Sequence, residues 1–169
     1  MKIKNIVKLF CISTLFVMAC SLYEEEKKAY EAEKKEIDAL LSDILKLENK
    51  ELGGEKKFKD YKDKINQLKE KFKDVDNAEL KEKLLKLQSL FEDKLAAKLA
   101  ALRAAKQTIE GISNKDDQTS KNKIWSESKL VGVTIKFSGN NTTGKGAEMS
   151  KEAVGQIDKI IEFLEEGTH

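Results

Sequence analysis

The stretch ELKEKLLKLQSLFEDKLAAKLAALRAAKQTIEGI, residues 79–112, decides the fold of this 169-residue chain. Its apolar side chains recur at steps of 3, 4 or 7, a spacing that keeps them on one face of a long α-helix. Asp76 followed by Glu79 fits a capping box at the start of this helix. The chain contains no proline, so its composition permits a helix of this length. The predicted apolar face consists of Leu80, Leu84, Leu87, Phe91, Leu95, Leu99, Leu102, Ile109 and Ile112.

Three further segments have the same amphipathic character. Residues 22–50 predict a first helix that ends at Gly53 and Gly54, and residues 153–166 predict a last helix that ends at Gly167. Between them, residues 55–76 carry apolar side chains at alternating steps of 3 and 4, the spacing of a coiled-coil seam. The seam residues are Phe58, Tyr61, Ile65, Leu68, Phe72 and Val75. The predicted fold is mainly α, an elongated three- to four-helix bundle with coiled-coil-like packing.

Residues 113–146 interrupt this pattern and are predicted to form a long loop inserted in the bundle. Residues 113–123, SNKDDQTSKNK, are polar turn formers, which indicates a surface loop. From Val131 to Phe137 apolar residues alternate with smaller or polar ones, which is typical of a half-buried strand. The weak run at residues 124–130 is its one convincing partner. The loop is therefore predicted to contain a short strand or small hairpin, or an irregular extended segment that lies on the helices.

The motif GNNTTGKG, residues 139–146, follows this strand and precedes the last helix, as a nucleotide-binding P-loop would. A P-loop requires a hydroxyl residue directly after its lysine to bind Mg²⁺, and Gly146 occupies that position after Lys145. The motif also requires a sheet of neighbouring strands, which the sequence does not supply. A glycine-rich turn is the better interpretation, and no cofactor is predicted.

The first twenty residues have the features of a bacterial leader. Three lysines precede an uncharged apolar run of about eleven residues, which is too short to span a bilayer. VMAC, residues 17–20, resembles the lipobox of bacterial lipoproteins, in which the cysteine is acylated and becomes the new N-terminus. The expected organisation is a signal peptide at residues 1–19, a lipidated tether from Cys20 to residue 30 that includes the start of the first helix, and a helical domain at 31–169.

The inventory of reactive side chains argues against an enzyme. The one histidine is His169 at the C-terminus, and Cys20 is expected to carry lipid. Without a placed histidine or a free cysteine, neither a catalytic triad nor a zinc site can be assembled, so no catalytic or metal-binding residue is predicted. The formal net charge of +2 gives no electrostatic case for nucleic-acid binding.

Recognition of another protein is the remaining class of function. Trp125 lies between Lys123 and Lys129, and an aromatic residue near basic residues is typical of an interface hot spot. The alternative is that Trp125 packs across the end of the bundle as a hydrophobic lid. Lys145 is a fourth candidate for ligand binding. The segment 113–146 as a whole is a better candidate than any one of these residues, because binding residues concentrate on long loops.

The leader MKIKNIVKLFCISTLFVMACS, residues 1–21, together with the helices rich in lysine and glutamate, resembles the surface lipoproteins of Borrelia. Within that group the chain is similar to the small helical factor H-binding proteins of relapsing-fever Borrelia. The resemblance implies a protein anchored by lipid in the outer membrane, at the cell surface, that captures host complement factor H. It also implies plasminogen as a second ligand, through internal lysines such as Lys145.

Two alternatives remain open at this level. An extracellular-matrix protein or a tick receptor as the ligand would leave the same helical pattern. A lipid-anchored structural protein of the envelope is the other function, with the seam at residues 58–75 pairing with a second copy of the chain.

Overall fold

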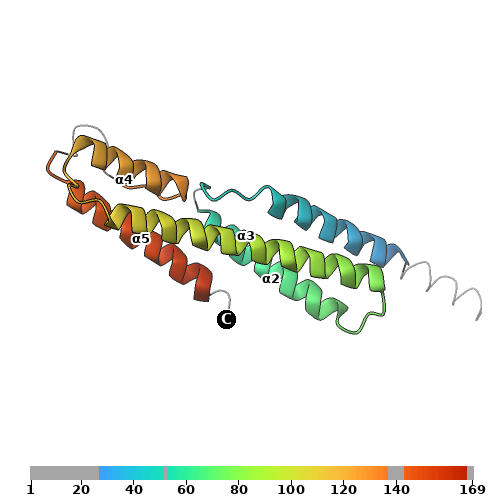
Figure 1. Ribbon diagram of the computed structural model, residues 1–169. Coiled ribbons are helices and arrows are strands. Elements are labelled where there is room, and N and C mark those ends of the chain that lie inside the picture. The colour runs from blue at the N-terminus through green and yellow to red at the C-terminus, as the bar shows by residue number, and fades with distance from the viewer. Residues whose placement is uncertain (1–26, 52, 137–142, 167–169) are drawn as a thin grey trace, which may run out of the picture. The chain divides into compact units, whose positions relative to one another are not determined.

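The part of the chain that the structure describes is built of helices and the connections between them. The computed structural model describes residues 27–51, 53–136 and 143–166 (Figure 1). No strand occurs in these ranges, so the mainly α prediction is confirmed. The chain divides into two compact units, Met1–Ala39 and Leu40–His169. The helices are residues 27–45, α2 (Gly54–Phe72), α3 (Ala78–Glu110), α4 (Gln118–Leu130) and α5 (Gly146–Glu166).

The first helix ends five residues earlier than predicted. Its last turn, in the second unit, buries Leu40 and Ile44. The N–H groups of Lys46 and Leu47 then donate to carbonyl groups three residues back, each at 3.1 Å, and this tighter turn closes the helix. The prediction that the glycine pair ends this helix is wrong. Gly53 has a φ of 66° and directly precedes α2, whose first residue is Gly54.

The second helix, α2, packs on α3 and α5 through the predicted seam. Four of the six seam residues are buried: Phe58, Ile65, Leu68 and Phe72. The ring of Phe58 lies 6.1 Å from that of Phe91 on α3, at an interplanar angle of 52°. This chain's own helices therefore cover the seam that the structural-protein alternative would use to pair with a second copy.

The long helix α3 confirms the predicted apolar face in most of its length. Leu80, Leu87, Phe91, Leu95, Leu102 and Ile109 are all buried. Its start differs from the prediction by one residue, because Asn77 and not Asp76 caps the helix: the Asn77 side chain accepts a hydrogen bond from the N–H of Leu80 at 3.1 Å. The sequence also did not predict that Lys98 is buried on this helix, with 1% of its surface exposed.

The prediction of a long loop at residues 113–146 is wrong, because α4 lies within it. Asp117 starts this helix by accepting hydrogen bonds from the N–H groups of Thr119 at 2.9 Å and Ser120 at 3.3 Å. The buried face of α4 consists of Lys121, Ile124 and Ser128. The hydroxyl of Ser128 donates to the carbonyl of Ile124 at 2.8 Å, so this buried polar group is satisfied within the helix.

The predicted short strand or small hairpin is also absent from the described residues. Residues 131 and 132 form a turn, and residues 133–136 follow without regular secondary structure; Val131, Val133 and Ile135 are buried, as their alternation predicted. Side chains of α5 satisfy part of its backbone: Gln156 donates to the carbonyl of Thr134 at 3.0 Å, and Glu152 accepts from the N–H of Lys136 at 3.3 Å. These contacts take the place of a partner strand. Phe137 lies outside the described residues.

Candidate binding surface

Two lysines of α3 hold the chain segments that meet beside the C-terminal end of α4. Lys94 donates to the carbonyl oxygens of Leu45 at 2.9 Å and Leu47 at 3.1 Å, where the first helix ends. Lys98, one turn later, donates to the carbonyl oxygen of Asn49 and, at 2.9 Å, to that of Val131. Helix ends leave carbonyl groups without backbone partners, and lysine side chains supply the missing donors here.

The ammonium of Lys98 is thus a buried link between the connector at residues 46–51 and the end of α4. Burial lowers the pKa of Lys98 below its ordinary value of 10.5, and the carboxylates of Glu55 and Glu51 oppose that shift in part. A second contact joins the same two segments at Gly132, which has a φ of 73°. A Cβ atom at Gly132 would lie 2.4 Å from the carbonyl oxygen of Glu51, so the two backbones approach as closely as glycine permits.

On the outer side of this junction, α4 presents apolar side chains to solvent. Trp125 is 46% exposed and Leu130 is 61% exposed. The Nζ atom of Lys129, one turn after Trp125, lies 5.2 Å from the centroid of the Trp125 ring, which is a cation–π contact. Nearly half of the Trp125 surface faces water, and the protein covers the rest.

An open depression adjoins this group and contains Lys129 in its wall. It has a volume of about 450 Å³ and is lined by Lys46, Glu48, Lys50, Glu51 and Lys129. Both carboxylates of the depression form ion pairs. A carboxylate oxygen of Glu48 lies 3.1 Å from the Nζ atom of Lys50, and Glu51 pairs with Lys57. We call Trp125, Lys129 and this depression the α4 surface; Leu130 lies five residues after Trp125, about 140° around the helix.

The structure brings together two of the four predicted ligand-binding residues. Trp125 and Lys129 contact each other, whereas Lys123 is exposed two residues before Trp125, about 200° around the helix. Lys145 is exposed and directly precedes α5. The lysines of the 46–51 connector were missed, because lysines distant in sequence give no periodic signal. Cys20, the predicted lipid attachment site, lies outside the described residues.

The start of α5 explains the glycine that departs from the P-loop pattern. A Cβ atom on Gly146 would lie 1.7 Å from the carbonyl oxygen of Lys115, so a larger residue has no space. The N–H of Gly146 donates to the carboxylate of Asp116 at 2.7 Å. An anion of the protein itself therefore holds the first turn of α5, where a P-loop would hold phosphate.

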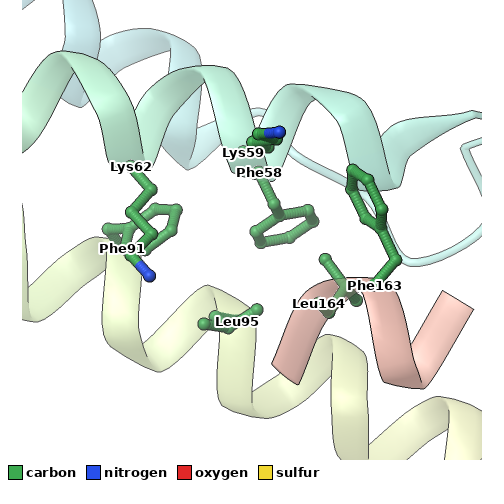
Figure 2. Close-up of a pocket in the computed structure, with 7 residues that line it drawn as sticks. All are labelled: Phe58, Lys59, Lys62, Phe91, Leu95, Phe163 and Leu164. Carbon is green, nitrogen blue, oxygen red and sulfur yellow. The ribbon is translucent and has the colours of Figure 1, made fainter. Parts of the chain in front are cut away.

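Figure 2 shows the apolar notch between α2, α3 and α5. Phe58, Phe91, Leu95, Phe163 and Leu164 form its walls, and Lys59 and Lys62 stand at its edge. The Nζ atom of Lys59 lies 5.9 Å from the centroid of the Phe163 ring. The notch has a volume of about 10 Å³, which is too small for a ligand, so it is a part of the core that reaches the surface.

In residues 27–51, 53–136 and 143–166, no group of three or more histidine, cysteine, aspartate or glutamate side chains has a metal-binding arrangement. None of the helices in these ranges is long and apolar enough to cross a membrane.

Comparisons with known proteins agree on one family. A family model described as Borrelia burgdorferi REV protein matches residues 1–166. The chain is also similar to the crystal structure of a Rev protein from Borrelia burgdorferi, with 67% identity and a TM-score of 0.75. This match covers 80% of the present chain and 97% of that chain. No curated protein matches the sequence.

The resemblance to Borrelia proteins is therefore confirmed at the level of the genus. The matching family is described by the name REV, which is not the narrower factor H-binding group of relapsing-fever Borrelia. On the extent of the family match and the identity to the crystallised relative, this chain belongs to the Borrelia burgdorferi REV protein family.

Proposed function

We propose that this REV family protein is a lipid-anchored protein of the bacterial surface that binds a host protein through the α4 surface. The observation that carries the proposal is the ring of Trp125, 46% exposed with the ammonium of Lys129 5.2 Å from its centroid, on a helix that packs on the long helix α3. A soluble protein gains free energy when such side chains are covered, and tryptophan is enriched among interface residues that dominate binding.

The rigidity of the α4 surface supports the same proposal. Lys98 and the close approach at Gly132 hold the end of α4 against the 46–51 connector, so a partner would meet a preformed site. A preformed site loses less conformational entropy on binding than a flexible loop does. Lys129 adds a positive charge beside the tryptophan ring, which favours a partner with carboxylates near its apolar contact residue.

Complement factor H is the host ligand that we propose to test first, with plasminogen second. Both come from the resemblance of the leader and the helices to Borrelia surface lipoproteins. Lipid attachment at Cys20 belongs to the same proposal. It predicts that the wild-type protein partitions into the detergent phase of Triton X-114 and that the Cys20→Ala variant remains in the aqueous phase.

The experiment is a binding titration of the purified protein without residues 1–20 against factor H, plasminogen and individual matrix proteins. We expect Trp125→Ala to weaken binding by about 2 kcal/mol, or about 30-fold in Kd. Leu85→Ala is the matched control, because Leu85 is 68% exposed on α3 and lies outside the α4 surface. Equal affinity of the Trp125→Ala and wild-type proteins for every captured ligand would exclude the α4 surface. If none of these proteins binds the wild type, factor H, plasminogen and the tested matrix proteins are excluded as its ligands.

A further inference from the structure

The helix α5 contains an exposed glycine that packing does not explain. Gly155 lies near the middle of the helix, and a Cβ atom built there would meet no other atom within 4 Å. Its φ is not positive, so its backbone does not require glycine either. Glycine in a helix interior costs about 1 kcal/mol relative to alanine. A glycine at such a place is useful when another molecule must approach the helix backbone closely.

An open hollow of about 560 Å³ lies over Gly155. Lys136 and residues of α5 line it, with the side chains of Lys136, Glu148, Lys151, Glu152, Gln156 and Lys159 around the glycine. From Glu148 to Lys159 the helix rises about 16 Å at 1.5 Å per residue. An extended polypeptide advances about 3.3 Å per residue, so about five residues of a partner would cover this length.

Three lysines around the hollow have no anionic partner in the described part of the chain. Lys136, Lys151 and Lys159 are exposed and form none of its ion pairs. Two carboxylates elsewhere on α5 are paired: Asp158 has an oxygen 2.7 Å from the Nζ atom of Lys106, and Glu165 pairs with Arg103. One carboxylate of the hollow is already engaged, since Glu152 accepts from the N–H of Lys136 at 3.3 Å and from Gln156 at 3.2 Å.

We propose that this hollow binds an acidic polypeptide segment, laid in extended conformation across Gly155. The three lysines would pair with carboxylates of the partner, and the missing side chain at Gly155 would let the partner's backbone approach α5. Glu148 and Gln156 favour a polypeptide over a sulfated polysaccharide. Their oxygens can accept hydrogen bonds from backbone N–H groups, whereas Glu148 would repel a uniformly anionic chain. This site is separate from the α4 surface and does not depend on it.

The test is an NMR titration of the isotope-labelled full chain at low salt, followed at the amide of Gly155. The probe is a six-residue peptide of alternating glutamate and serine, and a heparin fragment of similar length is the comparison. We expect saturable peptide binding that weakens as salt is added. Lys151→Gln should weaken it about threefold to fivefold, the effect of one exposed ion pair. Lys123→Gln on α4 is the matched control and should leave the affinity unchanged.

Gly155→Ala separates a binding role from a structural one. The added methyl group meets no atom of the protein, so we expect the melting temperature to rise while the peptide binds at least about threefold more weakly. The proposal is overturned if Gly155→Ala binds the peptide as tightly as the wild type, or if Lys151→Gln and Lys123→Gln behave alike. Tighter binding of the heparin fragment than of the peptide would also overturn it, in favour of a polysaccharide.

Discussion

The side-chain nitrogen of Lys98 lies 2.9 Å from the carbonyl oxygen of Val131, 33 residues away in the sequence. The same nitrogen donates to the carbonyl oxygen of Asn49, so one side chain joins α3 to two connectors. A protonated lysine has three N–H donors and a neutral one has two. Both carbonyl groups can therefore be satisfied in either protonation state, which lets a lysine persist at a site where 1% of its surface is exposed.

Replacing Lys98 by methionine tests how much this link stabilises the fold. Methionine retains much of the apolar stem but cannot donate, so two buried carbonyl groups lose their partner. We expect Lys98→Met to lower the free energy of unfolding by about 2–4 kcal/mol, measured by urea denaturation. Lys123→Met, at an exposed position of α4, should change it by less than about 0.5 kcal/mol. Equal stability of the two variants would contradict a structural role for Lys98.

The lowered pKa of Lys98 also predicts a pH dependence. In the unfolded chain this amine has its ordinary pKa of 10.5, and burial lowers the value in the folded state. Between the two values the unfolded state binds more protons, so the contribution of Lys98 to stability rises with pH. The difference in unfolding free energy between wild type and Lys98→Met should therefore increase as the pH approaches 10.5. Burial raises the pKa of Tyr61, which acts in the opposite direction, but this effect is common to both proteins and cancels in the difference. A difference that shrinks with pH would contradict the assignment.

Apolar periodicity predicted the long helices well because their buried faces are made of leucine, isoleucine and phenylalanine. It could not predict α4, whose buried face contains Lys121 and Ser128 beside the single apolar residue Ile124. Asp117, which caps this helix, stands among polar turn formers that indicate a loop. For the same reason the sequence could not identify Lys98, since a lysine on a helix is normally solvated.

The segment 131–136 shows a second feature that the sequence pattern could not predict. The alternation of Val131, Val133 and Ile135 correctly predicted which side chains are buried. It could not show whether the backbone would pair with a strand, because side-chain burial and backbone pairing are separate requirements. Glu152 and Gln156 on α5 supply hydrogen bonds to this backbone, and neither stands out in a single sequence. The candidate binding surface was predicted only at Trp125 and Lys129, which are close in sequence.

Gly132 offers a test of the junction that supports the α4 surface. Gly132→Ala would place a Cβ atom 2.4 Å from the carbonyl oxygen of Glu51, at a φ of 73° that L-residues rarely adopt. We expect a loss of about 2–4 kcal/mol in unfolding free energy, from backbone strain and overpacking together. Gly144→Ala is the matched control, with a φ of 65° but no atom within 4 Å of the new methyl group. It should lose only about 1–2 kcal/mol from strain, and an equal loss in both variants would show that the contact with Glu51 is not tight.

Gly146→Ser restores the hydroxyl that the P-loop pattern lacks and so decides between two interpretations of GNNTTGKG. If the motif held phosphate, this variant would gain nucleotide and Mg²⁺ binding. The structure predicts the reverse, because any Cβ atom there would lie 1.7 Å from the carbonyl oxygen of Lys115 and push the start of α5 away from Asp116. We expect a loss of about 1–3 kcal/mol in stability and no change in the fluorescence of a labelled ATP analogue.

Asp116→Asn, which retains an oxygen acceptor for the N–H of Gly146 but not the charge, should lose less stability than Asp116→Ala. A pair of equally destabilised Asp116 variants would mean that charge, and not the hydrogen bond, holds this helix end.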